Sequence, residues 1–375
     1  MTASRLTESG VEPAWMDTEP VRGGYPDPVL LALSGLERMR APARRLMPTP
    51  PIHHLFGLRP VSVGPAGVTF SIPTSPRLMS DEGFFYAGTS ALVADAALAG
   101  AVQVTLPPGA FVATSDLSFN FLRPVTVAGQ QLIARARPID VGRSLGLAEA
   151  TVEDAQGRLI AHATTRCFIS RLETPQLVED LVELPEPSYP NPDPYQRMVP
   201  GGGDGLKDYS SLQEIVAAKQ SGELPLAPCL DLFGFSQPSV DSGSFTLIAK
   251  ASPWLTSPVG VVYGGVLALL ADIVLSGAVS SSLSVRTVFS PLDLKVQFVR
   301  PVVPDGRQLR ATGKVVYRGR RMAAARAEIV NEDDKPVVLA TSSVVLFPDR
   351  TWAEVSVADE APTDEEVASL PGGDR

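Results

Sequence analysis

The longest hydrophobic stretch of the chain covers residues 261–281 and reads VVYGGVLALLADIVLSGAVSS. It contains Gly264 and Gly265 near its start and is then apolar on every side for several helical turns, apart from Asp272. A helix that is apolar all round must be buried in protein or in a membrane. A carboxylate inside such a helix is costly to bury unless it has a partner or a function. The pattern therefore predicts a buried helix that carries a candidate functional acid.

The same pattern occurs earlier, in residues 85–104, which read FYAGTSALVADAALAGAVQV. Asp95 stands there in the place of Asp272. Each acid follows a tyrosine by nine residues, Tyr86 in the first copy (95 − 86) and Tyr263 in the second (272 − 263). A pattern repeated at this length indicates a duplicated domain.

Alternating, β-branched segments surround both helices, and this alternation predicts strands. The expected strands cover residues 67–73, 111–121, 131–139, 145–152 and 159–169 in the first half, and 244–251, 292–298, 308–316, 322–330 and 337–347 in the second. One helix with four or five antiparallel strands, found twice, predicts an α+β fold in which each sheet wraps around its helix. A single unit leaves a sheet edge and one side of its helix uncovered. We therefore expect the two units to form an intramolecular pseudo-dimer.

Composition shifts suggest where the domains begin and end. We expect a disordered N-terminus over residues 1–26, a first domain over 27–172, a linker over 173–208, a second domain over 209–350 and an acidic disordered tail over 351–375. The pattern also predicts short helices at residues 27–40 and 211–222.

The chain has 375 residues and a formal net charge of −9, which argues against nucleic acid as a general partner. Its two cysteines, Cys167 and Cys229, form no metal-binding or disulfide pattern, as expected in a reducing compartment. The N-terminus lacks a basic start followed by an apolar run, so we expect a cytoplasmic protein. Each long helix has a central acid and strand-like flanks, which favours a buried helix over a membrane span.

The helix pattern, the Phe-Leu-Arg-Pro strand end at residues 121–124 and the run Gly142-Arg143-Ser144, together with ATVEDAQGRLIAHATTRCFI, resemble a known family. That family is the hotdog-fold acyl-CoA thioesterases of the phenylacetate-pathway (PaaI-like) type. The resemblance covers most of residues 50–170 and 225–347. The family begins its helix with His-Gly-Gly and places an acid nine residues after the His. In this chain a tyrosine stands at the His position of both copies.

The resemblance implies two active sites across the interface, each with the glycine-marked helix start of one unit facing the acid of the other. Site one joins Asp95 and Thr114 with Gly264, Gly265, Tyr263 and Ser257. Site two joins Asp272 and Pro291 with Tyr86, Ala87, Gly88 and Ser80. In the family a strand Ser or Thr often assists the acid, and Pro291 cannot donate a hydrogen bond. We therefore expect site one to be active and site two to be weakened or structural.

Thioester hydrolysis builds negative charge on the carbonyl oxygen, which N–H groups at a helix start are suited to receive. The facing carboxylate then acts as nucleophile or as general base. The expected substrate is an acyl-CoA or acyl-carrier thioester, and we expect no metal or organic cofactor. Arg143 and the run that contains Arg320 occupy equivalent turns between strands, where they are candidate contacts for CoA phosphates.

Two alternatives stay open. One is a catalytically silent hotdog that binds acyl-CoA or acts as an interaction module, which Tyr86, Ala87, Tyr263 and Pro291 favour. The other is hydration or dehydration of an acyl thioester, which usually requires a histidine on the helix, and neither central helix has one. The sequence also leaves open the acyl group, the carrier, and whether two chains pair as a homodimer.

Overall fold

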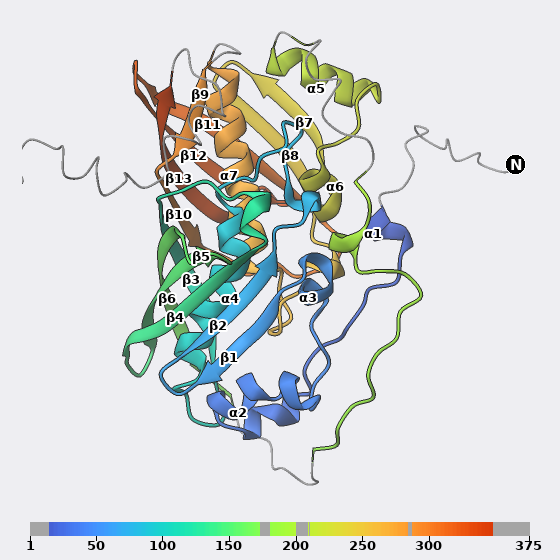
Figure 1. Cartoon of the computed structure of the whole chain (residues 1–375), viewed down its shortest axis with the longest axis vertical. Coiled ribbons are helices and arrows are strands. Elements are labelled where there is room, and N and C mark those ends of the chain that lie inside the picture. The colour runs from blue at the N-terminus through green and yellow to red at the C-terminus, as the bar shows by residue number, and fades with distance from the viewer. Residues whose placement is uncertain (1–14, 173–180, 200–208, 210, 284–286, 348–375) are drawn as a thin grey trace, which may run out of the picture.

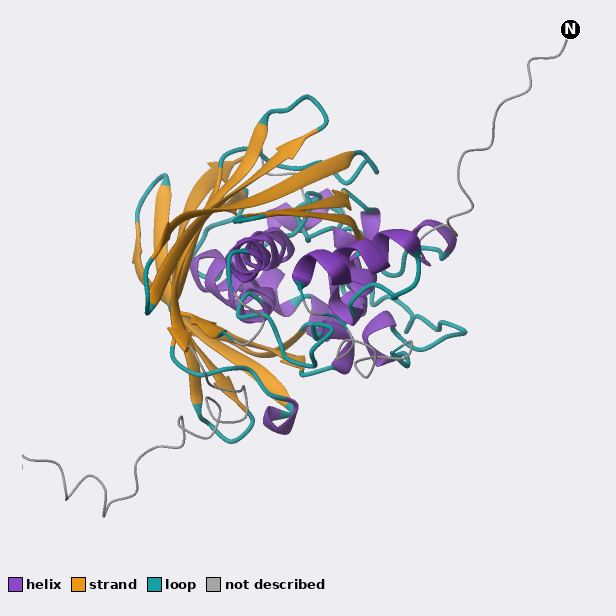
Figure 2. Ribbon diagram, turned by 90° about the horizontal axis from the view of Figure 1, so that it is seen from above, coloured by secondary structure: helices purple, strands orange, loops and turns teal. Residues whose placement is uncertain are grey.

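The computed structural model describes residues 15–172, 181–199, 209, 211–283 and 287–347. Its two long helices, α4 (Thr89–Gln103) and α7 (Gly264–Ser281), pack against each other inside a single curved sheet (Figures 1 and 2). Almost every side chain of both helices is buried, because they are apolar on all sides. By length and composition α7 is apolar enough to cross a membrane, but 78% of it is buried inside the protein. The prediction of buried central helices is confirmed.

The sheet is antiparallel throughout, in the order β1-β2-β4-β5-β6-β3-β10-β13-β12-β11-β8-β7, with β9 paired to β13. In the first half the strands are β1 (Arg59–Gly64), β2 (Gly67–Pro73), β3 (Ala110–Phe121), β4 (Gln131–Val141), β5 (Leu145–Asp154) and β6 (Leu159–Arg171). In the second half they are β7 (Phe235–Asp241), β8 (Ser244–Lys250), β9 (Val288–Pro291), β10 (Asp293–Phe298), β11 (Gln308–Arg318), β12 (Met322–Asn331) and β13 (Pro336–Phe347). The two halves join where β3 pairs with β10, for example at Leu117 and Val296. This is the expected α+β pseudo-dimer, with one sheet continuous across both units.

The shorter helices are α1 (Trp15–Thr18), α2 (Gly35–Arg40), α3 (Pro51–Phe56), α5 (Leu212–Ser221) and α6 (Pro228–Phe233), with 3₁₀ turns η1 (Pro28–Ala32), η2 (Pro42–Arg44), η3 (Pro76–Leu78), η4 (Val127–Gly129), η5 (Pro194–Gln196) and η7 (Pro253–Leu255). The helix expected at residues 27–40 is two elements, because Ser34 starts α2 with a capping box to Glu37. The helix expected at 211–222 is α5, capped by Ser211.

Three helices were not predicted: α1, which lies in the segment expected to be disordered, and the pair α3 and α6. α3 and α6 occupy matching places in the two halves, each with a proline at its start. Each ends at a glycine in the left-handed region, Gly57 with φ 77° and Gly234 with φ 66°, a conformation that favours glycine. α3 packs against η7 of the second half, and α6 packs against η3 of the first. These exchanged helices tie each half to the segment before the other half's central helix.

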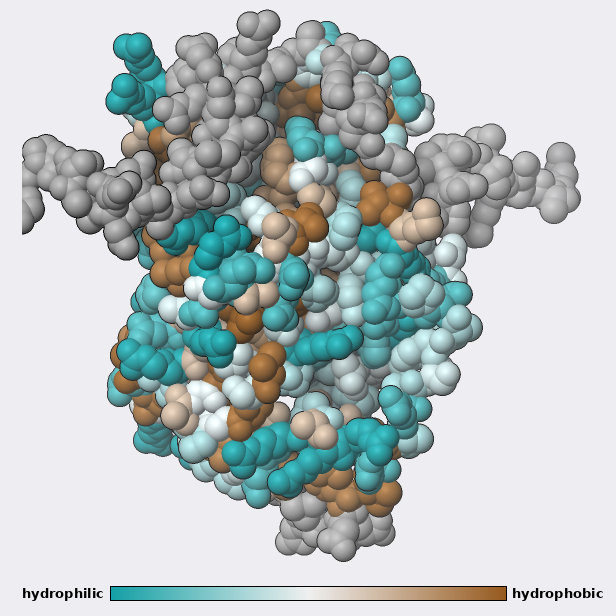
Figure 3. Space-filling view, viewed as in Figure 1, coloured by the Kyte–Doolittle hydropathy of each residue, from teal (hydrophilic) through white to brown (hydrophobic). Residues whose placement is uncertain are grey.

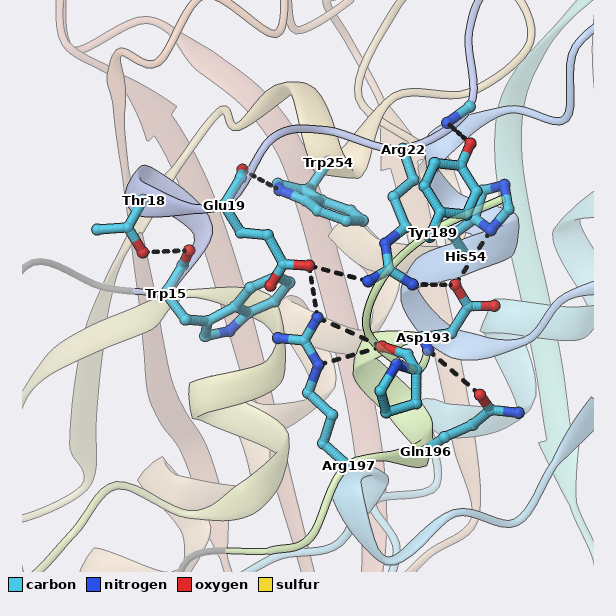
Figure 4. Close-up of polar contacts among 12 residues, drawn as sticks. Trp15, Thr18, Glu19, Arg22, His54, Tyr189, Asp193, Gln196, Arg197 and Trp254 are labelled. Carbon is cyan, nitrogen blue, oxygen red and sulfur yellow. Dashed lines mark hydrogen bonds and ion pairs between the residues drawn. The ribbon is translucent and has the colours of Figure 1, made fainter. Parts of the chain in front are cut away.

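Part of the N-terminus, expected to be disordered, is packed together with part of the expected linker (Figure 4). Arg22 donates to Glu19 at 3.0 Å and to Asp193 at 2.8 Å, and Arg197 donates to Glu19 at 2.6 Å. His54 of α3 lies 3.2 Å from Asp193 through Nδ1. We call these five residues the clasp. Residues 15–26, expected to be disordered, are thus packed against residues 181–199 of the expected linker, while residues 1–14 and the expected tail 351–375 lie outside the described residues.

The clasp lies beside the entry to α7. Trp254 of η7 donates its indole N–H to the Glu19 carbonyl at 3.4 Å, and its ring meets that of Trp15 edge-on at 5.2 Å between centroids. On the face seen in Figure 3, hydrophobic residues are scattered in small groups among hydrophilic ones.

Candidate functional site

Asp95 of α4 lies directly against the first turn of α7, so the acid of one half meets the glycine pair of the other. Its Oδ2 accepts a hydrogen bond from the Gly265 N–H at 2.9 Å, and a Cβ placed on Gly264 would stand 2.8 Å from the same oxygen. Its Oδ1 accepts a hydrogen bond from Thr114 Oγ1 at 2.9 Å. The structure therefore brings together the four residues predicted for the centre of site one.

Local structure explains this placement. The first N–H groups of a helix have no intrahelical acceptor, so Gly265 is free to donate to Asp95. The Gly264 N–H has no acceptor among the described residues. Side chains alternate between the two faces of a strand, so Thr114 and Leu117 of β3 would ordinarily point to opposite faces. A bulge at Ser115 shifts this alternation, and both side chains therefore face the helix.

Burial decides the charge of Asp95. Its residue is only 3% exposed, and this burial raises the pKa of the carboxyl to about 6, against the lowering effect of the hydrogen bonds from Thr114 and Gly265. A carboxyl group with this pKa is mostly ionised near neutral pH, yet it is a stronger proton acceptor than an ordinary aspartate. Such a value is suited to a general base.

Tyr263 is buried beside Asp95, and its contact with substrate stays a prediction. Its residue is 5% exposed, its hydroxyl donates to the Leu92 carbonyl at 2.9 Å, and its ring stacks on Phe56 of α3 at 6.1 Å. The tyrosine thus fastens the start of α7 to α4 without separating Gly265 from Asp95. Ser257, also expected to contact substrate, donates to the Val261 carbonyl at 2.8 Å and closes the turn before the helix.

Site two has the same hydrogen bond between acid and helix start as site one, but among the described residues it lacks the side-chain hydrogen bond that Thr114 provides. Asp272 Oδ2 accepts a hydrogen bond from the Gly88 N–H at 2.8 Å, as Asp95 does from Gly265. Asp272 Oδ1 is buried and has no hydrogen-bond partner among the described residues, and Pro291 occupies the place of Thr114. Burial raises the pKa of Asp272 to about 6 as well, with only the Gly88 N–H lowering it. The predicted asymmetry between the two acids is present.

Two ion pairs join the loop that leads into α4 to helices of the second half. Lys219 of α5, whose side chain is 5% exposed, forms an ion pair with Asp81 at 2.7 Å, and Arg77 forms one with Asp231 of α6 at 2.7 Å. Tyr86, a predicted substrate contact, is partly exposed, and its pKa is raised by burial first and then by the nearby carboxylates. Site two thus lies beside a loop that two ion pairs fix in place. Among the described residues, its acid lacks the second hydrogen-bond donor that Asp95 has in Thr114.

Two predicted contacts lie apart from both acids. Arg143 is in the turn between β4 and β5, and Arg320 is in the turn between β11 and β12, and both are exposed. In the described part of the chain, neither forms a hydrogen bond with Asp95 or Asp272. Their contact with CoA phosphates stays a prediction.

Sequence reasoning missed Phe298, which closes site one from the strand side. Its Cζ lies 3.2 Å from the position that a Cβ on Gly264 would take. The sequence signal for Phe298 is the repeated strand end, in which Phe121 is the matching residue of the first half. Phe121 itself stacks on Phe119, with 5.8 Å between the ring centroids. Among the described residues, no group of three or more His, Cys, Asp and Glu side chains is arranged to hold a metal ion.

Comparison with known families agrees with this arrangement. Residues 82–161 and 259–338 each match the family described as Thioesterase superfamily. Each half of the chain carries a thioesterase-superfamily domain. Both matches include the helix start of their own half and its acid, so the two sites combine elements of the two domains. Thioester hydrolysis is therefore the reaction class that the two matches support.

The chain is also similar to solved structures, and the first of those below shows the same fold over most of the chain. The TesB protein of Mycobacterium avium subspecies paratuberculosis is 15% identical, with a TM-score of 0.50, and the match covers 80% of this chain and 98% of that one. The acyl-CoA thioesterase II TesB2 of Mycobacterium marinum is 15% identical, with a TM-score of 0.47 and the same coverage. The PaaI protein of Escherichia coli is 22% identical, with a TM-score of 0.33, and covers 37% of this chain and 98% of its own. No curated protein sequence matches the chain.

Proposed function

We propose that the protein hydrolyses acyl-CoA thioesters at site one, with Asp95 as the catalytic carboxylate. The observation that carries the proposal is the position of Asp95, held between Thr114 of its own half and Gly265 of the other. A buried carboxylate is costly, and this one has both oxygens oriented and a pKa raised to about 6. Groups tuned in this way are concentrated at functional sites.

In the proposed reaction, Asp95 takes a proton from the water that attacks the thioester carbonyl. The proton then passes to the departing thiolate, so that carboxylic acid and free thiol leave. We favour this role over direct attack by Asp95, because a pKa raised to about 6 suits a general base that works near neutral pH. The alternative, a mixed anhydride formed on Asp95 and then hydrolysed, gives the same products.

The donor for the developing oxyanion is the Gly264 N–H. The expectation that both glycines serve as donors changes here, because Asp95 already accepts the Gly265 N–H. The Gly264 N–H has no acceptor among the described residues and lies at the positive end of the α7 dipole. Preorganised donors of this kind stabilise the transition state without reorganisation.

The finer assignments belong to the same proposal. The helix-start layout is that of the phenylacetate-pathway type, and CoA is the carrier that we favour. The reaction needs no metal or organic cofactor, and the protein acts in the cytoplasm. These four statements rest on the sequence alone.

The test is release of free thiol from a panel of aliphatic and aromatic acyl-CoAs, followed with a thiol-reactive chromophore. We expect turnover of at least one member, with most of it lost in Asp95→Asn. The observation that favours a silent binder instead is the 3% exposure of Asp95. Stoichiometric binding of an acyl-CoA without any thiol release would establish that alternative.

A further inference from the structure

The outer face of the sheet carries unequal charges in the two halves. Cross-strand register places Arg137 of β4 opposite Glu149 of β5, and the two form an ion pair. At the matched position of the second half, Lys314 of β11 stands opposite Arg326 of β12. Like charges directly opposite each other destabilise a sheet. The second half thus has a pair of cations where the first half has an oppositely charged pair.

A third cation lies in line with these two across the strands of the sheet. Arg326 is in register with Thr341 of β13, which is in register with Lys295 of β10, and Lys295 stands where the first half has Ser118. Lys295, Lys314 and Arg326 are exposed and form no ion pair with any described residue. We call these three residues the cationic row. In a chain of net charge −9, such a row is a local feature.

The cationic row lies in a hollow of about 750 Å³ on the sheet. Arg310, Gln297 and Thr312 also line this hollow, and Glu328 is the carboxylate on its wall. α4 and α7 lie on the inner face of the sheet, so they leave this outer face uncovered (Figure 2). Concave shape and unneutralised positive charge together indicate a site for a multiply charged anion.

We propose that the cationic row binds the phosphates of the nucleotide end of coenzyme A, while the thioester reaches site one. This inference rests on the function proposed above, and it names a contact surface other than the turns of Arg143 and Arg320. The ligand class is adenosine 3′,5′-bisphosphate with its diphosphate extension, which presents several phosphate oxygens to lysine and arginine.

The row and site one share strand β10. Lys295 and Gln297 face outward, whereas Phe298 faces inward and closes over Gly264. Pairing between β3 and β10 ends at Asp116 and Gln297, while β3 continues past this point to Thr114. On that side Thr114 pairs with no strand among the described residues. The proposal requires the linear arm of the thioester to pass from the outer face to Asp95 beside the end of β10.

The decisive variant is Arg326→Glu, which restores the pairing seen at Arg137 and Glu149 and is therefore compatible with the fold. We expect it to raise the KM for acyl-CoA about tenfold, because it removes one charge-assisted phosphate contact and adds a repulsive charge. The KM for the N-acetylcysteamine thioester of the same acyl group, which lacks the nucleotide, stays unchanged. Arg137→Gln is the matched control and leaves both values unchanged.

Equal effects of Arg326→Glu on both thioesters, or no effect on acyl-CoA, would overturn the proposal. Calorimetric titration with adenosine 3′,5′-bisphosphate tests the row even in a protein that hydrolyses nothing. If the cationic row is the nucleotide site, wild type and Asp95→Asn bind adenosine 3′,5′-bisphosphate and Arg326→Glu does not. Absence of binding by wild type, or equal competition by inorganic phosphate at the same concentration, rejects the assignment.

Discussion

Thr114 donates a hydrogen bond to one oxygen of Asp95 at 2.9 Å, and this contact is what distinguishes the two sites. Asp272 makes the same backbone contact as Asp95, but its other oxygen is buried with no partner in the part of the chain that the structure describes. A buried unpaired acceptor costs about 1–3 kcal/mol. The chain keeps both acids at the interface, yet only one of them is oriented on both oxygens. This favours a single active site in the double-domain chain.

Thr114→Val is expected to lower kcat roughly tenfold or more, because hydrogen bonds to charged groups contribute about 1.5–3 kcal/mol. Thr114→Ser keeps the hydroxyl and retains most of the activity. Steady-state thiol release with one acyl-CoA measures both. Ser115→Ala, which removes the neighbouring hydroxyl in the bulge, is the control and stays near wild type. An unchanged kcat in Thr114→Val would show that the contact has no part in the reaction.

The rate of hydrolysis is expected to rise with pH through about 6, since burial raises the pKa of Asp95 to about 6 and the base must be ionised. One pH unit below this value, kcat falls to roughly one tenth of its plateau. In Thr114→Val the rising limb moves to higher pH, because the hydroxyl lowers the pKa of Asp95. A pH–rate profile of both proteins measures the shift. A flat profile between pH 5 and 8 contradicts the role of Asp95 as base.

Asp272 links stability to pH. Burial raises its pKa from 3.8 to about 6, so the folded state binds the proton more tightly than the unfolded state does. The resulting stabilisation is fully present below the unfolded pKa and is lost as pH rises through the folded one. Between about pH 4.5 and about pH 8, this group lowers the free energy of unfolding by roughly 2 kcal/mol.

Asp272→Asn should reduce that pH dependence by the same amount. Urea unfolding at the two pH values measures it for wild type and variant. An identical pH dependence in both proteins would mean that Asp272 is not protonated preferentially in the folded state.

Arg22→Ala is expected to lower the free energy of unfolding by about 2 kcal/mol, because it leaves Glu19 and Asp193 without a shared partner. The Arg22 side chain is only 4% exposed, and the clasp that it joins supports the entry to α7. Arg310→Gln removes an ion pair whose side chains are 53% and 74% exposed, and it costs at most about 1 kcal/mol. Urea unfolding compares the two variants. Equal losses would mean that the clasp contributes no more than a surface pair.

Much of the site was predictable because it rests on spacing. The matched distances from Tyr86 to Asp95 and from Tyr263 to Asp272 indicated the duplication, and the family resemblance implied that each acid faces the other helix. Thr114 and Pro291 follow from the same alignment. Spacing along a helix survives folding unchanged, so a single sequence carries it.

The rest depends on contacts between distant segments. The direction of the Tyr263 ring is set by Phe56 and by the Leu92 carbonyl, which lie more than a hundred residues away in sequence. The clasp escaped prediction because its segments are polar, and they are ordered by pairing with each other across 171 residues, as Arg22 does with Asp193. Neither contact leaves a local pattern.

The most direct test of the account compares Asp95→Asn with Asp272→Asn for kcat/KM on the best acyl-CoA substrate. Both variants keep the size of the side chain and an oxygen for the opposing glycine N–H. The account predicts a loss of roughly a hundredfold or more in Asp95→Asn, since a general base contributes about that much, and activity within about threefold of wild type in Asp272→Asn. Equal losses in both variants, or a loss confined to Asp272→Asn, would contradict it.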